Sequence, residues 1–331
     1  MNRYCPKTIA AASRRQFLEK SALGFGALAA STLLGATNPF ASKRPHFAAT
    51  AKSVIFLFMH GGPSHIDTFD PKPLLNKLHG QPIPKSFGKV DFQFSNMERT
   101  PLMGSPRKFQ RHGQSGLEIS DLFPETARHA DELAVIRSCH HDGFTHVTGQ
   151  TWMNTGWGRV GRPSIGSWVV YGLGNESENL PAYVVMLDGG IKAGAPAYGA
   201  GFLPAAYQGT VLRSEGPPIL NIKRPDGITG EDQEKMLGML RELNESHQAP
   251  RADDTELAAR MASYELAFKM QMSVPSVTDL SKETEATRQL YGLDEANTRE
   301  FGTQCLMARR MVENGVRFVQ LYSGGRKGAE V

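Results

Sequence analysis

The fold class is decided by the stretch Val54-Ile55-Phe56-Leu57-Phe58-Met59-His60-Gly61-Gly62-Pro63. Its six apolar residues do not alternate with polar ones, and they end at glycine and proline. Such a run is typical of a strand that is buried on both faces of a parallel sheet. Similar runs over 133–136, 182–187 and 316–322 predict three more strands.

Between these runs the apolar residues recur at helical spacing. The pattern predicts helices over 121–131, 148–154, 165–173, 231–245, 254–272, 282–291 and 297–314. The segment 70–116 is polar, rich in glycine and proline, and has no clear period, so we expect it to run over the surface. Strands that alternate with helices predict an α/β fold with a mostly parallel sheet flanked by helices.

The composition supports a folded chain. It has 331 residues, of which 40% are hydrophobic, and this is enough for a sizeable core. Three cysteines exclude a disulfide-stapled mini-protein and a cysteine-rich zinc module. Cys139 and Cys305 could pair in an oxidising compartment, but two buried free thiols are the simpler interpretation.

The first 41 residues resemble an export signal. Ser13-Arg14-Arg15-Gln16-Phe17-Leu18-Glu19-Lys20 is a twin-arginine pattern, and an uncharged run rich in Ala, Leu and Gly follows over 21–39. The apolar part of that run is about 15 residues, shorter than the roughly 20 that a membrane-spanning helix needs. We therefore expect a signal over residues 1–41 that is cut between 36 and 51, transport by the twin-arginine translocase, a periplasmic or otherwise exported protein, and no stable transmembrane segment.

The signal also explains the net charge. The chain carries a formal charge of +4, and the first 41 residues hold five basic residues and one acid. The mature chain is then close to neutral, so nothing favours a nucleic-acid partner. Because this export route carries proteins that are already folded, often with a metal or cofactor inserted, it favours a metalloprotein.

Histidines follow two of the predicted strands. His60 comes directly after the strand 54–59, with Asp67 close by, and His141 follows the strand 133–136. Ligands of parallel α/β sheets bind beyond the carboxyl ends of the strands. Imidazole and carboxylate groups there predict a divalent metal site, for zinc, calcium or magnesium, with His60, Asp67 and His141 as ligands. The alternative is that these are loop histidines satisfied by backbone hydrogen bonds.

An anion site is predicted beside the second histidine segment. A helix begins at about Val147, and Thr148 lies in its first turn, where free N–H groups and the helix dipole favour an anion. Arg159 and Arg162 follow on a glycine-rich loop and could clamp the same anion. Such a site suits a phosphate or sulfate ester. The alternative is that both arginines are solvated loop charges.

Several motifs together resemble one family. They are Phe58-Met59-His60-Gly61-Gly62-Pro63-Ser64-His65-Ile66-Asp67-Thr68-Phe69-Asp70-Pro71-Lys72-Pro73 and the segments 133–138, 153–156, 161–168 and 315–321. They resemble a bacterial family catalogued as domain of unknown function 1501, over roughly residues 52–325. That family is grouped with alkaline phosphatases and sulfatases, so the resemblance implies an alkaline-phosphatase-like fold and metal-dependent hydrolysis of an ester.

The resemblance can be followed onto two residues. The metal-binding aspartate that ends the first strand in that superfamily corresponds to His60. The nucleophile, nine positions before the threonine of the Thr155-Gly156 pair, corresponds to His146. Histidine binds metals and forms covalent phosphoryl intermediates, but it cannot become the formylglycine of sulfatases. The resemblance thus implies His146 as a catalytic residue, and we expect Arg162, from its place on the glycine-rich loop, to act with it as a catalytic residue.

The family pattern also continues past the strand 316–322, with further metal-ligand segments that this sequence lacks. We therefore expect residues 52–331 to be the N-terminal part of such a domain, incomplete at its C-terminus, with 316–322 as an exposed edge strand. The function expected is an exported, metal-dependent hydrolase of small-molecule or glycan sulfate or phosphate esters. The alternatives are a non-catalytic periplasmic or surface module that binds a glycan or a partner in the same pocket, and an inactive fragment.

Overall fold

A computed structural model describes residues 50–88, 90, 100–189, 191–213, 227–251 and 255–324. The export signal predicted over 1–41 lies outside the described residues. Within them, no helix is both long enough and apolar enough to cross a membrane.

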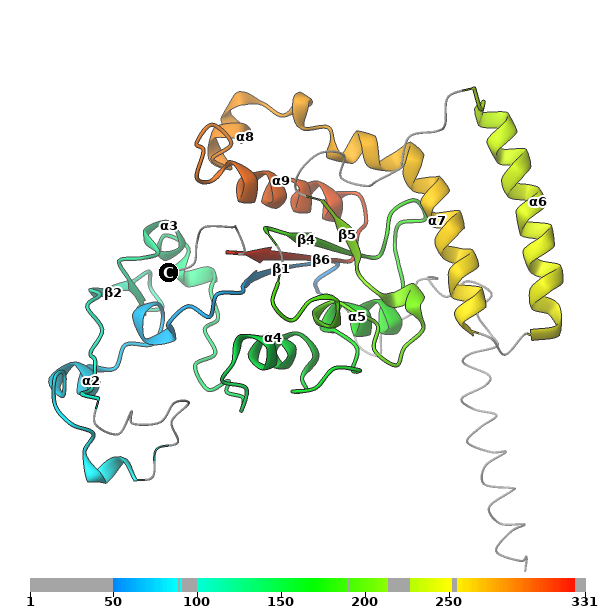
Figure 1. Ribbon diagram of the computed structural model, residues 1–331. Coiled ribbons are helices and arrows are strands. Elements are labelled where there is room, and N and C mark those ends of the chain that lie inside the picture. Colours follow the sequence, from blue (N-terminus) through cyan, green and yellow to red (C-terminus); the bar gives the residue numbers. More distant parts are fainter. Residues whose placement is uncertain are drawn as a thin grey trace, which may run out of the picture.

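A four-stranded sheet forms the centre of the molecule (Figure 1). Its order is β1 (Val54–Met59), β6 (Phe318–Ser323), β4 (Tyr183–Leu187) and β5 (Thr210–Leu212), and every neighbouring pair is parallel. On one face lie α4 (His146–Thr155) and α5 (Ile165–Leu173), and on the other lies α9 (Arg299–Glu313). The predicted mixed α/β fold, with a mostly parallel sheet flanked by helices, is confirmed.

Each face of the sheet carries its own apolar core. In β6, Phe318 and Tyr322 face α5, whereas Val319 and Leu321 face α9, and all four are buried. Both faces are covered, so the strand reads as a continuous apolar run with little alternation. The core on the α9 face also includes Val274 of α7 (Thr255–Thr278).

The expected position of the strand 316–322 was wrong. It is not an exposed edge, because β6 lies between β1 and β4 and bonds to both along its length. The edge strands of this sheet are β1 and β5, and four apolar side chains of β1 are exposed: Val54, Ile55, Leu57 and Met59. Sequence order does not determine pairing order, since β6 inserts between strands that precede it by more than a hundred residues.

The strand predicted over 133–136 is also absent. Ala130–Glu132 form one turn of 3₁₀ helix, and the chain then continues without regular structure to α4. Ile136 is 71% exposed, so this short apolar run buries little surface. Four apolar residues are too few to distinguish a buried strand from an extended loop. The second histidine segment consequently does not follow a strand of the sheet.

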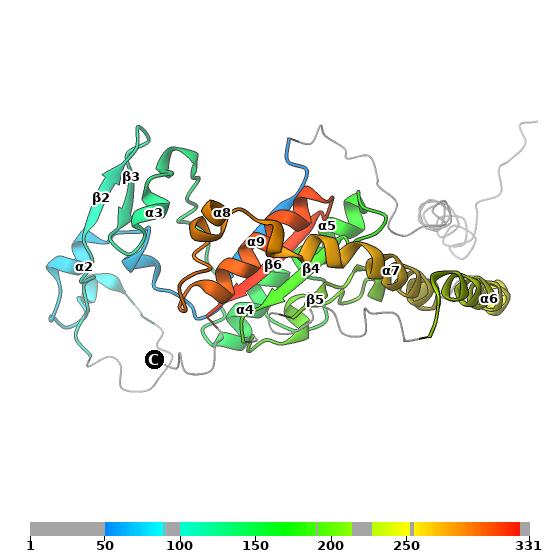
Figure 2. The ribbon, with the colours of Figure 1, turned by 90° about the horizontal axis from the view of Figure 1, so that it is seen from above.

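A small lobe lies beyond the carboxyl ends of β1 and β6 (Figure 2). It contains α2 (Pro73–Lys77), the antiparallel hairpin of β2 (Phe109–His112) and β3 (Leu117–Ser120), and α3 (Pro124–Ala127). The hairpin was not predicted within the segment 70–116. Its turn uses Gly113 and Gly116, both at positive φ, and this pair of glycines between alternating residues was the available signal.

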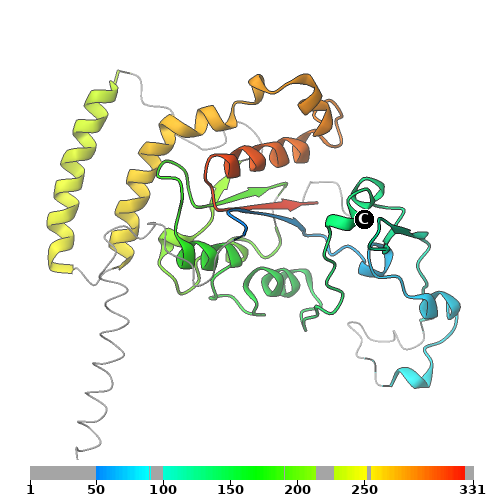
Figure 3. The ribbon, with the colours of Figure 1, turned by 180° about the vertical axis from the view of Figure 1, so that it is seen from behind.

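Two long helices stand at the opposite end of the molecule, α6 (Gly230–Gln248) and α7 (Figure 3). A capping box begins α6: the Thr229 side chain accepts from Asp232 N, and the Asp232 side chain accepts from Thr229 N. The remaining short helix, α8 (Glu285–Leu290), precedes α9. The helices predicted over 165–173, 231–245, 254–272 and 297–314 are thus present, with ends that differ by a few residues.

Candidate functional site

The carboxyl ends of three neighbouring strands meet at one edge of the sheet. His60 follows β1 and its N–H donates to Ser323 O (3.1 Å), while Asp188 follows β4 and its N–H donates to Tyr322 O (3.1 Å). Gly324 follows β6 between them: its N–H lies 3.5 Å from Asp188 Oδ2, and a Cβ on it would lie 3.9 Å from His60 Cδ2. His60 and Asp188 therefore flank Gly324 where such sheets bind ligands.

His60 is held by a glutamine from α4. Its side chain is buried, at 8% exposure, and Gln150 is buried at 4%. Gln150 Nε2 donates to His60 O (2.9 Å) and lies 3.3 Å from His60 Nδ1, and Gln150 Oε1 accepts from Ala193 N (2.9 Å). Gln150 thus joins the end of β1 to the loop after β4.

Gln150 lies on the face of α4 that packs toward the sheet. His146, Gln150 and Asn154 are spaced four residues apart, so they lie on the same face of the helix. Gln150 and Asn154 are buried, and His146, one turn before Gln150, is exposed at the helix N-terminus. The helix therefore places the imidazole of His146 one turn away from the residue that contacts His60.

Buried polar atoms without a partner collect at this edge. Three are His60 Nε2, Asp188 Oδ1 and Gln304 Oε1, none of which has a hydrogen-bond partner among the described residues. Gln304 belongs to α9, and its Nε2 donates to Leu187 O at the end of β4 (3.4 Å). Because buried polar atoms are almost always paired, one donor or acceptor nitrogen and two acceptor oxygens here indicate a site for a polar ligand.

A buried hydrogen-bond network supports the wall behind the site. Asn154 Oδ1 accepts from Tyr322 Oη (3.0 Å) and from Gln320 Nε2, and Tyr183 Oη donates to Gln320 Oε1. Burial raises the pKa of both tyrosines well above the usual value, so the phenols stay protonated as donors. The network fixes α4 against β4 and β6.

The residues predicted as metal ligands each contact different residues and do not meet at one point. Asp67 accepts from Ser105 Oγ, and the hydrogen bonds from Ser105 and Ser64 hold its pKa below the usual range. His141 is exposed, stacks on Trp152 and accepts from Gly143 N through Nδ1 (3.0 Å). Across the described ranges, no three His, Cys, Asp or Glu side chains stand close enough to hold an ion. The described residues therefore do not fit a three-ligand metal site.

The predicted anion groups at α4 are partly used by the helix itself. Thr145 is the N-cap, and its Oγ1 accepts from Thr148 N (3.4 Å) and lies 2.8 Å from Thr148 Oγ1. A capping side chain satisfies an amide that an anion would otherwise take. The backbone N–H groups left for an anion in this first turn are thus those of His146 and Val147, because the N–H of Thr148 is bonded to the cap.

The two predicted arginines lie beyond the other end of α4. Arg162 stacks its guanidinium on Trp157, 4.6 Å from the ring centre, and Arg159 is exposed on the same loop. Trp157 in turn contacts Trp152, which stacks on His141. His141, Trp152, Trp157 and Arg162 therefore form one stacked series, the aromatic ladder. Neither of its ends, His141 or Arg162, hydrogen-bonds to His60.

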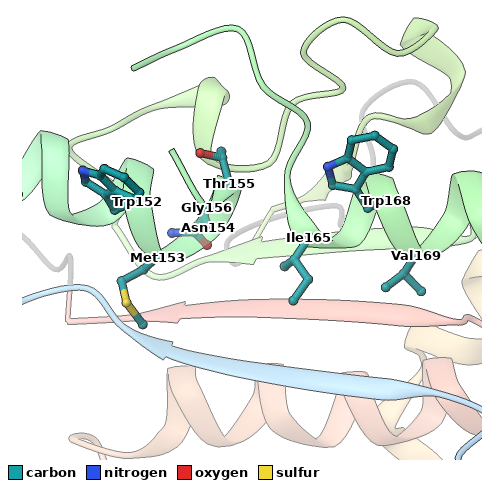
Figure 4. A pocket seen from close by; sticks show the side chains of 8 residues that line it. All are labelled: Trp152, Met153, Asn154, Thr155, Gly156, Ile165, Trp168 and Val169. Atoms are coloured by element: carbon teal, nitrogen blue, oxygen red, sulfur yellow. The ribbon is translucent and has the colours of Figure 1, made fainter. Parts of the chain in front are cut away.

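A groove of about 490 Å³ opens between α4 and α5 (Figure 4). Its lining residues are Trp152, Met153, Asn154, Thr155, Gly156, Ile165, Trp168 and Val169. In this view Met153, Ile165 and Val169 point the opposite way from the two indoles. Val169 packs against the core on the α5 face, whereas Met153 and Ile165 are exposed. The side chains of Asn154 and Thr155 are bonded within the protein, so the groove offers mostly apolar walls.

Sequence reasoning missed Gln150, Asp188 and Gln304. Asp188 was visible as an acid directly after the predicted strand 182–187, followed by two glycines. Gln150 was visible through its four-residue spacing from His146 and Asn154. Gln304 gave no signal, because only the packing of α9 brings it to the sheet edge.

The comparisons with known proteins give one match. Residues 51–325 match the family model described as protein of unknown function (DUF1501). No curated protein and no solved structure matches the chain.

Proposed function

The chain belongs to the DUF1501 family, and we propose that it binds and hydrolyses a phosphate or sulfate ester at the carboxyl edge of its sheet. The observation that carries this proposal is the set of unpartnered buried atoms on His60, Asp188 and Gln304. The expected grouping of this family with alkaline phosphatases and sulfatases supports the same chemistry, and the parallel sheet is compatible with a fold of that type.

The mixture of donors and acceptors at the edge suits an ester of a polyhydroxy compound. The anionic oxygens of such an ester accept hydrogen bonds, and the imidazole of His60 can donate one. Its alcohol part carries hydroxyl hydrogens, which Asp188 Oδ1 and Gln304 Oε1 can accept. A glycan sulfate or phosphate has both kinds of group, whereas an inorganic anion alone leaves the two acceptors unpaired.

His146 is the proposed nucleophile toward a phosphate ester. Its exposed imidazole lies at the positive end of α4, one turn from Gln150. Attack by a ring nitrogen on phosphorus forms an N–P bond and breaks the bond to the alcohol oxygen, which takes a proton from solvent water. Another water then attacks phosphorus and breaks the N–P bond, which releases inorganic phosphate and the free imidazole. No step is routed through a metal, since the described residues supply no three-ligand set.

The test is hydrolysis of p-nitrophenyl phosphate and p-nitrophenyl sulfate by the full chain and by His146→Ala. We expect the variant to lose at least about two orders of magnitude in kcat/KM while its melting temperature is unchanged. His129→Ala, at another exposed histidine, is the matched control and should retain full activity. Full activity in His146→Ala would overturn the nucleophile assignment.

The second candidate is a non-catalytic module that binds a glycan. It is favoured by the aromatic ladder, because Trp157 is 43% exposed and carries Arg162 on its ring. Aromatic faces and arginine bind the apolar faces and the anionic groups of charged sugars. If the chain hydrolyses neither ester but its tryptophan fluorescence responds to a sulfated glycan, and Trp157→Ala abolishes that response, this candidate replaces the first.

A further inference from the structure

We infer that Gln150 fixes His60 as a hydrogen-bond donor through Nε2, so that His60 binds an oxygen of the anionic ester and does not bind a metal. This inference rests on the proposed function for its ligand, and it adds to it a positioning residue and a protonation state.

The orientation of the Gln150 amide is fixed by backbone groups. Its Oε1 lies 2.9 Å from Ala193 N, which can only donate, and its Nε2 lies 2.9 Å from His60 O, which can only accept. If the two amide atoms were exchanged, the donor Nε2 would face the donor Ala193 N, and the acceptor Oε1 would face the acceptor His60 O. The contacts therefore determine which end of the amide faces His60.

The fixed amide in turn determines the tautomer of the imidazole. Gln150 Nε2 lies 3.3 Å from His60 Nδ1 and carries hydrogens, so Nδ1 is the acceptor of this pair. A neutral imidazole that accepts at Nδ1 carries its proton on Nε2. The buried Nε2 is then an N–H donor that has no acceptor among the described residues.

An unpaired buried donor calls for an acceptor, and the ester oxygen supplies one. The chain directly after His60 is open, because added Cβ atoms on Gly61 and Gly62 would have nothing within 4 Å. The backbone there can be approached closely by a ligand. The site is thus polar at His60 and open at the glycines that follow.

The same geometry opposes metal binding at His60. A histidine that ligates a metal through Nε2 carries its proton on Nδ1 and normally donates it to a carboxylate or carbonyl oxygen. Here Nδ1 faces an amide N–H, which is the opposite polarity. A metal at Nε2 would leave two hydrogens directed at each other between His60 and Gln150.

The test is nitrogen NMR of the full chain labelled at histidine, with multiple-bond ¹H–¹⁵N correlations that report which ring nitrogen carries the proton. Wild-type His60, assigned by its loss in His60→Asn, should show a protonated Nε2 and an unprotonated Nδ1. Saturating inorganic phosphate or sulfate should then shift the Nε2 signal. A protonated Nδ1 in the wild type overturns the inference.

Gln150→Glu is the informative variant, because a carboxylate beside Nδ1 accepts a hydrogen bond and moves the proton from Nε2 to Nδ1. We expect at least about tenfold weaker phosphate binding and about tenfold tighter zinc binding than in the wild type. Gln304→Glu adds the same charge at the same edge without touching His60, so it controls for charge repulsion. Equal effects of the two variants on the His60 tautomer and on zinc binding contradict the positioning role.

The two proposals can fail separately. If the wild type shows the Nε2–H tautomer and a phosphate-dependent shift but hydrolyses no ester, the inference stands and the hydrolase proposal fails. If Nε2–H is present and neither phosphate nor sulfate changes its signal, the anion-binding role of His60 is overturned.

Discussion

Tyr322 of β6 donates a hydrogen bond to Asn154 of α4, with 3.0 Å between Oη and Oδ1. Both residues are almost completely buried, and Asn154 also accepts from Gln320. The contact therefore holds the helix that carries His146 and Gln150 against the central strand. A change at Asn154 acts on the stability of the fold and on the position of the site together.

We predict that Asn154→Ala lowers the free energy of unfolding by about 2–4 kcal/mol, because Gln320 Nε2 and Tyr322 Oη lose the buried acceptor that they share and a small cavity opens. Tyr322→Phe removes the hydroxyl that donates to Asn154 and accepts from Gln320 Nε2, but it leaves Asn154 bonded to Gln320, so we expect a smaller loss of about 1 kcal/mol. Urea unfolding measures both. The interpretation fails if the two variants lose equal stability or neither loses any.

Arg317 gives a second stability prediction. Its side chain is 8% exposed, and its Nε donates to Gly174 O (2.8 Å) while Nη2 lies 3.0 Å from Glu176 Oε1. Arg317→Met should cost about 3 kcal/mol, since it strands a buried carbonyl. Glu176→Gln should cost less than about 1 kcal/mol, because Glu176 is 44% exposed. Thermal unfolding of both variants checks the order, and a larger loss in Glu176→Gln would contradict it.

Glu283 makes stability depend on pH. Arg310 Nη1 (2.6 Å) and Arg309 Nη2 (3.1 Å) bond its carboxylate, and these hydrogen bonds hold its pKa below the usual value of 4.5. A lowered folded pKa contributes stability above the unfolded pKa, and this contribution is lost as the pH falls through the folded pKa.

We therefore predict that Glu283→Gln has a lower Tm than the wild type near pH 7, and that the difference shrinks as the pH falls from about 5 to about 3. Melting curves across this range provide the measurement. Glu313→Gln, at a more exposed partner of Arg309, is the control and should show a much smaller pH-dependent difference. A difference that stays constant down to pH 3 would contradict the assignment.

Much of the fold could be predicted because its signals are local. The helix predicted over 165–173 is α5 with the same bounds, since Ser164 caps it and its own apolar residues mark the buried face. The strand 182–187 was recognisable for the same reason. The pairing order was not, because the position of β6 between β1 and β4 is set by packing across the whole chain.

Only part of the candidate site could be predicted from the sequence. His60 was predicted from its place after a strand, and the structure confirms that place, but we propose that its imidazole binds an anion and not the metal predicted from the sequence. Its neighbour Gln150 lies 90 residues away in the sequence, and no local pattern connects the two. The histidine cluster after residue 139 suggested a shared site, whereas in the structure His141 packs on Trp152. Residue type and spacing thus indicate candidates, and only long-range packing decides which of them meet.

The two cysteines of the described part should differ in reactivity. Cys139 and Cys305 are both free thiols, as predicted, but the prediction that both are buried was wrong for Cys139. Cys139 is exposed, whereas burial raises the pKa of the Cys305 thiol to about 11. Because the thiolate is the reactive form, iodoacetamide near pH 8 should modify Cys139 much faster. Peptide mapping in a Cys5→Ser background measures the two rates, which should become similar only after unfolding in urea.

The export signal expected over residues 1–41 can be tested directly. Arg14 and Arg15 form the twin-arginine pair, so replacing both with lysine keeps the charge and removes the guanidinium groups that the translocase is expected to read. We predict that the double variant accumulates in the cytoplasm at its uncut length, whereas the wild type reaches the periplasm and loses its leader. Cell fractionation with an antibody against the chain distinguishes the two. Arg3→Lys, which preserves the pair, is the control and should be exported normally. Equal export of the double variant and the wild type would show that the chain leaves the cytoplasm by another route or not at all.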